Sequence, residues 1–141
     1  MGVDGHRNQV FLTSFPRSGN TFLRKLVEQM TGVPTGSTMP VTTGQLQMTS
    51  MKGEHVSDDS IWVCKTHFPL QMRGERAFGV HKTLIIARHP LDVFPSYAAM
   101  INTMSHGNKP AYEMHSEFPE WWTWWVKRQT HLMKTQFEAF K

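Results

Sequence analysis

Residues 10–32 read VFLTSFPRSGNTFLRKLVEQMTG, and this stretch indicates the fold class of the chain. Its first five residues, Val10–Ser14, form a short apolar run that is typical of a buried strand. In residues 21–31 the apolar side chains instead recur on one helical face, with charged side chains opposite. Between them lies the loop FPRSGNT, with small residues and one arginine. A strand, a short loop and a helix in this order are typical of α/β proteins, whose junctions of this kind bind phosphate groups.

Further strands and helices are predicted along the rest of the chain. Residues 61–65 and 82–87 are apolar runs like the first one, and we expect each to form a buried strand. A helical pattern runs from residue 91 to about residue 104, and Pro119 opens a longer helix at its first position. The segments that remain between these elements are predicted loops, 33–60 and 104–116.

These elements predict an α/β fold of the P-loop-like, three-layer type, with a central parallel sheet flanked by helices. The length of 141 residues suits one domain, residues 1–141. In such sheets, ligands bind at the carboxyl ends of the strands. A polar motif follows each of the three predicted strands, and this common position predicts a single site. The motifs are PRSGNT at 16–21, KTHFP at 65–69 and RHPLDVFPSY at 88–97.

The composition bears on several classes of function. The formal net charge of +4 fits an anionic ligand. The sequence lacks the dense run of Lys and Arg that often indicates nucleic-acid binding, so no nucleic-acid partner is predicted. Cys64 is the only cysteine, which excludes an internal disulfide and a cysteine-rich zinc site. No apolar run reaches the roughly 20 residues that cross a bilayer, so no transmembrane segment is predicted. The compartment stays open: one cysteine and the lack of a signal-peptide core favour the cytoplasm, and the alternative is a membrane anchor that precedes this sequence.

The PRSGNT loop has the residues of a phosphate or sulfate site, although a purely structural interpretation stays open. Gly19 allows a tight backbone turn, and Arg17 adds a fixed positive charge. The start of the following helix presents unpaired N–H groups, to which Ser18, Asn20 and Thr21 can add side-chain donors. The loop lacks the first glycine and the Gly-Lys-Ser/Thr ending of a Walker A motif. Alternatively, Asn20 or Thr21 only caps a structural helix.

The two later motifs offer a base and a second anion-binding pair. Lys65 and His67 point the same way if the strand stays extended, and a neutral histidine can remove a proton near pH 7. Arg88 directly follows an apolar strand, and Ser96 lies eight residues further on, so both can bind one phosphate. The alternatives are a structural or surface histidine at position 67 and a surface ion pair between Arg88 and Asp92.

In this order, SFPRSGNTF, KTHFP and RHPLDVFPSY resemble three motifs of the sulfotransferases that use 3′-phosphoadenosine 5′-phosphosulfate (PAPS). The family's first motif, typically Tyr-Pro-Lys-Ser-Gly-Thr-Thr-Trp, holds the 5′-phosphosulfate. Its second, Lys-Thr-His-Leu-Pro, carries the catalytic histidine, and its third is Arg-x-Pro-x-Asp-x-x-x-Ser-Tyr. The order, the Lys-Thr-His triplet and the Arg-to-Ser spacing all match, and the resemblance covers residues 10–97.

The resemblance implies a role for each motif residue. Arg17 takes the place of a lysine beside the bridging oxygen and 5′-phosphate, and Phe22 that of a tryptophan that stacks on adenine. Lys65 would stabilise charge on the sulfuryl group or leaving phosphate, and His67 would take the proton from a small-molecule acceptor, an alcohol, phenol, sugar or amine. The donor would leave as 3′-phosphoadenosine 5′-phosphate (PAP), without a metal. The cofactor-binding residues would be Arg17, Ser18, Gly19, Asn20, Thr21, Phe22, Arg88 and Ser96, the last two at the 3′-phosphate.

The sequence also departs from the family, and other functions stay open. An arginine at position 17 cannot serve as a mobile proton donor as lysine can. Family members are longer, with a later strand and a later loop over the 3′-phosphate. We therefore expect either an incomplete sulfotransferase-like domain or a natural short form that acts as a non-catalytic interaction subunit. A P-loop kinase or NTPase is a third candidate, which lacks support because the Walker lysine is absent.

Four tryptophans gather in the stretch EFPEWWTWWVKR. They cover more than one face of the predicted helix, whereas core packing uses about one. We expect two of them to pack inward and two to meet a missing C-terminal part or a protein partner. The alternative is a hydrophobic wall for an apolar acceptor. The four are Trp121, Trp122, Trp124 and Trp125.

Overall fold

The computed structural model describes residues 9–39, 51–67, 82–105, 107–110 and 112–139. The chain forms two compact units. Unit 1 consists of Met1–Ser14 and Gly19–Ile86, and unit 2 consists of Phe15–Ser18 and Ala87–Lys141. Unit 1 contains the described strands and the first helix, whereas unit 2 contains the later helices.

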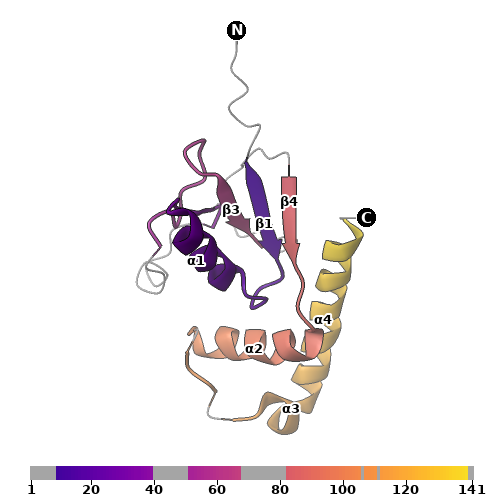
Figure 1. Cartoon of the computed structure of the whole chain (residues 1–141). Coiled ribbons are helices and arrows are strands. Elements are labelled where there is room, and N and C mark those ends of the chain that lie inside the picture. Colours follow the sequence, from indigo (N-terminus) through magenta and orange to yellow (C-terminus); the bar gives the residue numbers. More distant parts are fainter. Residues whose placement is uncertain (1–8, 40–50, 68–81, 106, 111, 140–141) are drawn as a thin grey trace. The chain divides into compact units, whose positions relative to one another are not determined.

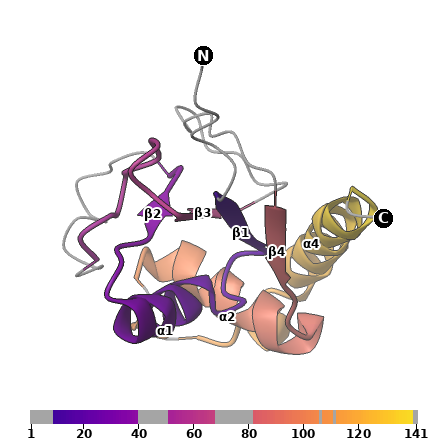
Figure 2. The same ribbon diagram turned by 45° about the horizontal axis from the view of Figure 1, so that its top comes forward.

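Unit 1 is built on a four-stranded parallel sheet with the strand order β2-β3-β1-β4 (Figures 1 and 2). Helix α1 (Asn20–Thr31) follows β1 and lies beside the sheet in both views. The predicted α/β fold with a parallel sheet and helices is confirmed, and it is consistent with a three-layer α/β fold. The strands are β1 (Val10–Ser14), β2 (Gly36–Ser37), β3 (Val63–Thr66) and β4 (Lys82–Ile86).

The three predicted strands are present. However, β4 was predicted to be buried, and most of it is exposed. Leu12 and Cys64 of the inner strands are almost fully buried, at 1% and 0% exposure. By contrast, β4 is the last strand of the described sheet, and Leu84 is 52% exposed. An apolar run reports the hydrophobicity of a segment but not which neighbours cover it. The two-residue strand β2 falls in a predicted loop, because two residues are too few to show an alternating pattern.

The buried face of helix α1 is shifted from the predicted one, since Leu23 and Val27 are only half-buried. Phe22 and Met30 of the predicted apolar face are 74% and 76% exposed. The buried side chains are Asn20 and Arg24, the latter with no exposed surface. Both are polar, and both make hydrogen bonds inside unit 1 that offset the cost of burial. The sequence prediction assigned the face from hydrophobicity alone and so excluded them.

Unit 2 contains helices α2 (Pro90–Thr103), α3 (Met114–Glu117) and α4 (Pro119–Glu138). The predictions of α2 and of Pro119 as the first residue of a long helix are confirmed, whereas α3 lies in a predicted loop. One turn of helix is too short to show an apolar period, so no pattern indicated it. In the part of the chain that the structure describes, no helix is long and apolar enough to cross a bilayer.

The tryptophans of α4 pack differently from the expected two-and-two division. Trp125 is buried with Ala98 and Met114, and both Trp121 and Trp122 pack against this cluster. Trp121 stacks on Trp125, with ring centroids 5.4 Å apart. Trp124 alone of the four is more than half exposed, at 53%, and the Arg128 guanidinium lies 5.6 Å from its ring centroid. A protein partner at residues 121–125 therefore stays a prediction with one exposed ring to support it.

Candidate functional site

The backbone of the predicted phosphate loop turns through two left-handed residues. Arg17 has φ 69° and Gly19 has φ 100°. For a side chain other than glycine this conformation costs on the order of 1–3 kcal/mol, and such residues gather at ligand-binding sites. The residue that caps α1 is Gly19, and no side chain caps the helix. The prediction that Asn20 or Thr21 caps the helix is therefore wrong, whereas a structural role of the loop is not tested by this observation.

Among the polar side chains of this loop, Asn20 makes structural hydrogen bonds, whereas the Ser18 hydroxyl makes none with the described residues. The Nδ2 of Asn20 donates to the carbonyl oxygen of Leu12 at 2.9 Å and to the hydroxyl of Ser14 at 3.1 Å. These bonds fasten the start of α1 to β1. The hydroxyl of Ser18 is buried and has no hydrogen-bond partner among the described residues. A buried hydroxyl of this kind is costly unless something binds it, so it fits a loop that receives an anion.

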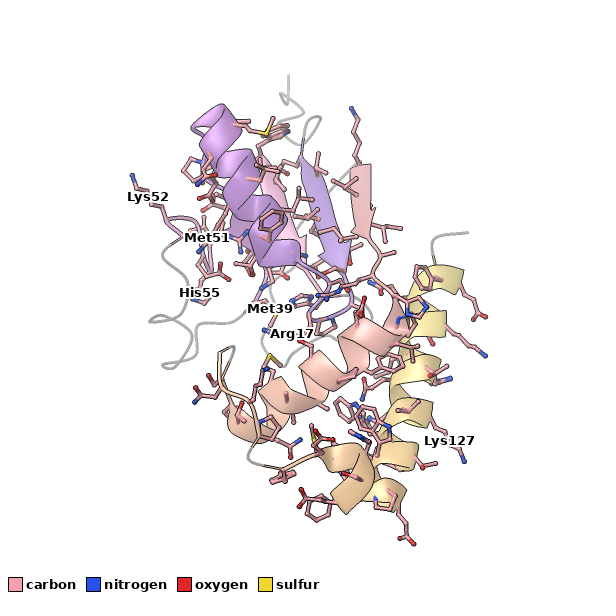
Figure 3. All side chains as sticks on the ribbon, turned by 60° about the horizontal axis from the view of Figure 1, so that its bottom comes forward. Arg17, Met39, Met51, Lys52, His55 and Lys127 are labelled. Atoms are coloured by element: carbon pink, nitrogen blue, oxygen red, sulfur yellow. The ribbon has the colours of Figure 1, made fainter. Side chains whose placement is uncertain are left out.

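Three of the predicted cofactor-binding side chains meet in unit 2. The Nε of Arg17 donates to the hydroxyl of Ser96 at 2.9 Å, and Arg88 donates from Nη1 to the carbonyl oxygen of Arg17 at 3.4 Å (Figure 3 labels Arg17). The predicted surface pair is also present, since Arg88 Nε lies 3.9 Å from Asp92 Oδ2. Both partners of that pair are about half exposed, so the attraction between them is weak.

The predicted base, His67, follows the last residue of β3 and is oriented by the strand beside it. Its Nδ1 lies 3.0 Å from the carbonyl oxygen of Ser14 and 3.4 Å from the Ser14 hydroxyl. A carbonyl oxygen can only accept a hydrogen bond, so Nδ1 carries the proton in the neutral ring. The lone pair of the ring then lies on Nε2, which is the atom that can remove a proton.

Lys65 lies in β3 on the same face of the sheet as Leu12 and Ser14. It pairs with Leu12 in the register of β1 and β3, and side chains alternate along a strand. Burial lowers the pKa of Lys65, the carboxylate of Glu54 raises it, and Arg24 lowers it further, so that the pKa falls below 10.5 overall. The common face of Lys65 and His67 stays a prediction, because β3 ends at Thr66 and the register of β1 and β3 does not include His67.

The remaining predicted residues lie on the first turn of α1. Phe22 projects into solvent with 74% of its surface exposed, and Thr21 is half-buried. The predicted cofactor residues thus belong to both units. Gly19, Asn20, Thr21 and Phe22 are in unit 1, and Arg17, Ser18, Arg88 and Ser96 are in unit 2.

Unit 2 also contains a cavity of about 550 Å³ that the sequence did not predict. Arg17 and Ser96 line it together with the apolar side chains of Met100, Tyr112 and Trp122. A cavity of this size with mainly apolar walls and a few polar groups is typical of sites for small organic molecules. Within the described ranges, no three His, Cys, Asp or Glu side chains are placed to hold a metal ion.

Sequence reasoning missed two charged residues that the structure places near Lys65. Arg24 and Glu54 form an ion pair of 2.6 Å, with side-chain exposures of 0% and 10%. The one available signal was the spacing of Asn20 and Arg24, four residues apart and so on one helical face. Glu54 offered no signal, because it lies in a segment without a periodic pattern.

The chain is similar to WSCD family members. It is 37% identical over 94 residues to WSCD family member AAEL009094 of Aedes aegypti, a match that covers 62% of this chain and 28% of the relative. It is 39% identical over 80 residues to WSCD family member CG9164 of Drosophila melanogaster, which covers 56% of this chain and 23% of the relative. The matches thus span about a quarter of the length of these curated relatives, whose names state no activity. No family model matches the chain, and no solved structure does.

Proposed function

We propose that this chain is part of an enzyme that transfers a sulfuryl group from PAPS to a hydroxyl or amine acceptor. The observation that carries the proposal is the adjacency of the three strands that precede the motifs. These strands are neighbours in the parallel sheet, in the order β3-β1-β4. Motifs that resemble those of PAPS-dependent sulfotransferases therefore follow three adjacent strands, and this is the arrangement that a shared ligand at the carboxyl ends requires.

The residues of the first motif fit an anionic cofactor. Arg17 supplies a charge, and the Ser18 hydroxyl is buried with no bond in the described structure. In this proposal Arg17, Ser18 and the first turn of α1 hold the 5′-phosphosulfate, and Phe22 covers the adenine. Arg88 and Ser96 hold the 3′-phosphate, which distinguishes PAPS from ATP-like nucleotides. When bound, PAPS supplies an activated sulfuryl group.

The chain's own part in the chemistry is positioning, charge stabilisation and one proton transfer. His67 takes the proton of the acceptor on Nε2, while Ser14 fixes the other ring nitrogen. Lys65 stabilises the negative charge that develops on the transferred group and the leaving phosphate. The cavity of unit 2 suits an organic molecule, and two of its lining residues, Arg17 and Ser96, are among the proposed phosphate-binding residues.

A calorimetric titration with PAP tests the proposed cofactor site. We expect one PAP to bind per chain and Arg88→Ala to weaken the affinity about tenfold or more, because a hydrogen bond to a charged group contributes roughly 1.5–3 kcal/mol. The matched control is Lys127→Ala, which removes an exposed cation from α4 in the same unit (Figure 3) and should keep the affinity within about twofold. An Arg88→Ala affinity equal to that of the control would remove Arg88 from the site.

A further inference from the structure

The loop between β1 and α1 packs on helices of unit 2. Residues Phe15–Ser18 belong to unit 2, although the chain before and after them belongs to unit 1. Phe15 is buried and contacts two rings of α2, with ring centroids 5.9 Å from Phe94 and 5.7 Å from Tyr97. The contact with Tyr97 is edge-to-face, an arrangement that aromatic pairs favour. The first residue of the loop is therefore anchored on α2.

The contacts between rings continue from α2 to α4. The ring centroid of Tyr97 lies 5.3 Å from that of Trp125, which is buried in one cluster with Ala98 of α2. The indole N–H of Trp125 has no hydrogen-bond partner among the described residues, so this side chain contributes through the packing of its ring. Phe15, Tyr97 and Trp125 thus form an aromatic row from the loop to α4. Its last member lies outside residues 10–97, which carry the resemblance to sulfotransferases.

The rest of the loop has a conformation that depends on its surroundings. Arg17 has φ 69°, which costs free energy in a residue other than glycine and persists only where the surrounding structure fixes it. The amide of Ser18 donates to the carbonyl oxygen of Phe15 at 3.2 Å, so the turn closes on the anchored residue. In this turn the Nε of Arg17 reaches the hydroxyl of Ser96 at 2.9 Å. The packing of Phe15 therefore supports the backbone that carries Arg17 and Ser18.

We propose that Tyr97 and Trp125 are positioning residues for this loop. By holding Phe15, they keep Arg17 and Ser18 in the arrangement that receives an anionic cofactor. Neither ring is assigned a contact with the cofactor, so both act through the loop. A ligand binds more tightly to a loop that already has its bound conformation, because less ordering is then required on binding. The inference rests on the proposed function only for the identity of the anion, since the aromatic row is a property of unit 2.

Hydrogen exchange of the Ser18 amide, measured by NMR, tests the inference without any ligand. We expect Trp125→Leu to speed this exchange about tenfold or more, because the loop loses support and opens locally. The reference is the amide of Val93, which donates to the carbonyl oxygen of His89 in α2 and reports a general loosening of unit 2. Its exchange should change by less than about threefold.

Trp124→Leu is the matched control for this measurement, since it removes the neighbouring ring of α4, which is more than half exposed. It should leave the exchange of both amides within about twofold of the wild type. Equal acceleration of Ser18 and Val93 in Trp125→Leu would mean that Trp125 only stabilises unit 2, and it would overturn the inference. Exchange of Ser18 no faster than in the control would also overturn it.

A double-mutant cycle on the affinity for PAP tests whether Trp125 acts through the loop. Trp125→Leu should weaken PAP binding about tenfold in the wild-type background but only about twofold when Arg17 is already replaced by alanine, because coupled residues are not additive. Trp125→Phe keeps an aromatic ring and should restore most of the affinity. Equal losses in the two backgrounds would contradict a role through Arg17.

Tyr97→Leu removes the middle ring of the aromatic row and takes the place of Trp125→Leu in both measurements if that variant does not fold. We expect the same selective acceleration at Ser18 and the same loss of PAP affinity. Exchange of Ser18 that stays at the wild-type rate in whichever variant folds overturns the inference. If the wild type does not bind PAP, the proposed function fails, whereas the exchange rates still decide whether Tyr97 and Trp125 hold the loop.

Discussion

His67 has one ring nitrogen committed to the backbone of unit 1, since Nδ1 lies 3.0 Å from the carbonyl oxygen of Ser14. That contact could not be predicted from the sequence, because Ser14 and His67 are 53 residues apart. The motif Lys-Thr-His indicated the residue, and the contact with Ser14 orients its ring. The chemical consequence, a lone pair on Nε2, follows from the carbonyl group being an acceptor only.

Replacement of His67 tests whether this histidine acts as a base. We expect His67→Ala to lower turnover from PAPS by two to four powers of ten, roughly the contribution of a positioned general base. The affinity for PAP should stay within about twofold, because no phosphate contact is assigned to His67. The measurement pairs a sulfate-transfer assay with a PAP titration, and His131→Ala on the exposed side of α4 serves as control. Turnover of His67→Ala equal to that of the control would show that the base is another group.

At the scale of elements, the periods of the sequence predicted where strands and helices lie better than which faces they bury. Strands β1, β3 and β4 and helices α1, α2 and α4 fall where the patterns placed them. The buried face of α1 was not predicted correctly, because Arg24 is buried with hydrogen-bond partners from two later segments, Thr35 and Glu54. Those partners come together only when the chain folds, so no local pattern contains them.

The close packing of the loop 51–55 on β2 gives a prediction for the stability of unit 1. Gly53→Ala should lower the free energy of unfolding by about 1–3 kcal/mol, because its Cβ would overlap the backbone of Thr35, which cannot move without disturbing Arg24. Gly107→Ala is the matched control, since a Cβ there has no atom within 4 Å. It should change the free energy by less than about 0.5 kcal/mol. Denaturant unfolding of both variants gives the comparison, and equal stabilities would refute the close approach.

At the scale of the whole molecule, the proposed function draws on residues of both units. His67, Lys65 and the first turn of α1 belong to unit 1, and Arg17, Ser18, Arg88 and Ser96 belong to unit 2. Sequence motifs predicted these residues because each motif lies at the carboxyl end of a predicted strand, and the strands β3, β1 and β4 are neighbours in the sheet of unit 1. The Arg24–Glu54 ion pair and the cavity of unit 2 depend on tertiary contacts, so the sequence motifs could not predict either of them.

A competition between PAP and ATP for the wild-type protein tests the central claim most directly. Both ligands carry adenine and phosphates, but PAP alone has the 3′-phosphate assigned to Arg88 and Ser96. The protein would be titrated with PAP in the absence and in the presence of excess ATP. The account predicts that PAP binds and that ATP leaves its apparent affinity almost unchanged. Displacement of PAP by ATP, or the absence of PAP binding, would contradict a PAPS-dependent sulfotransferase.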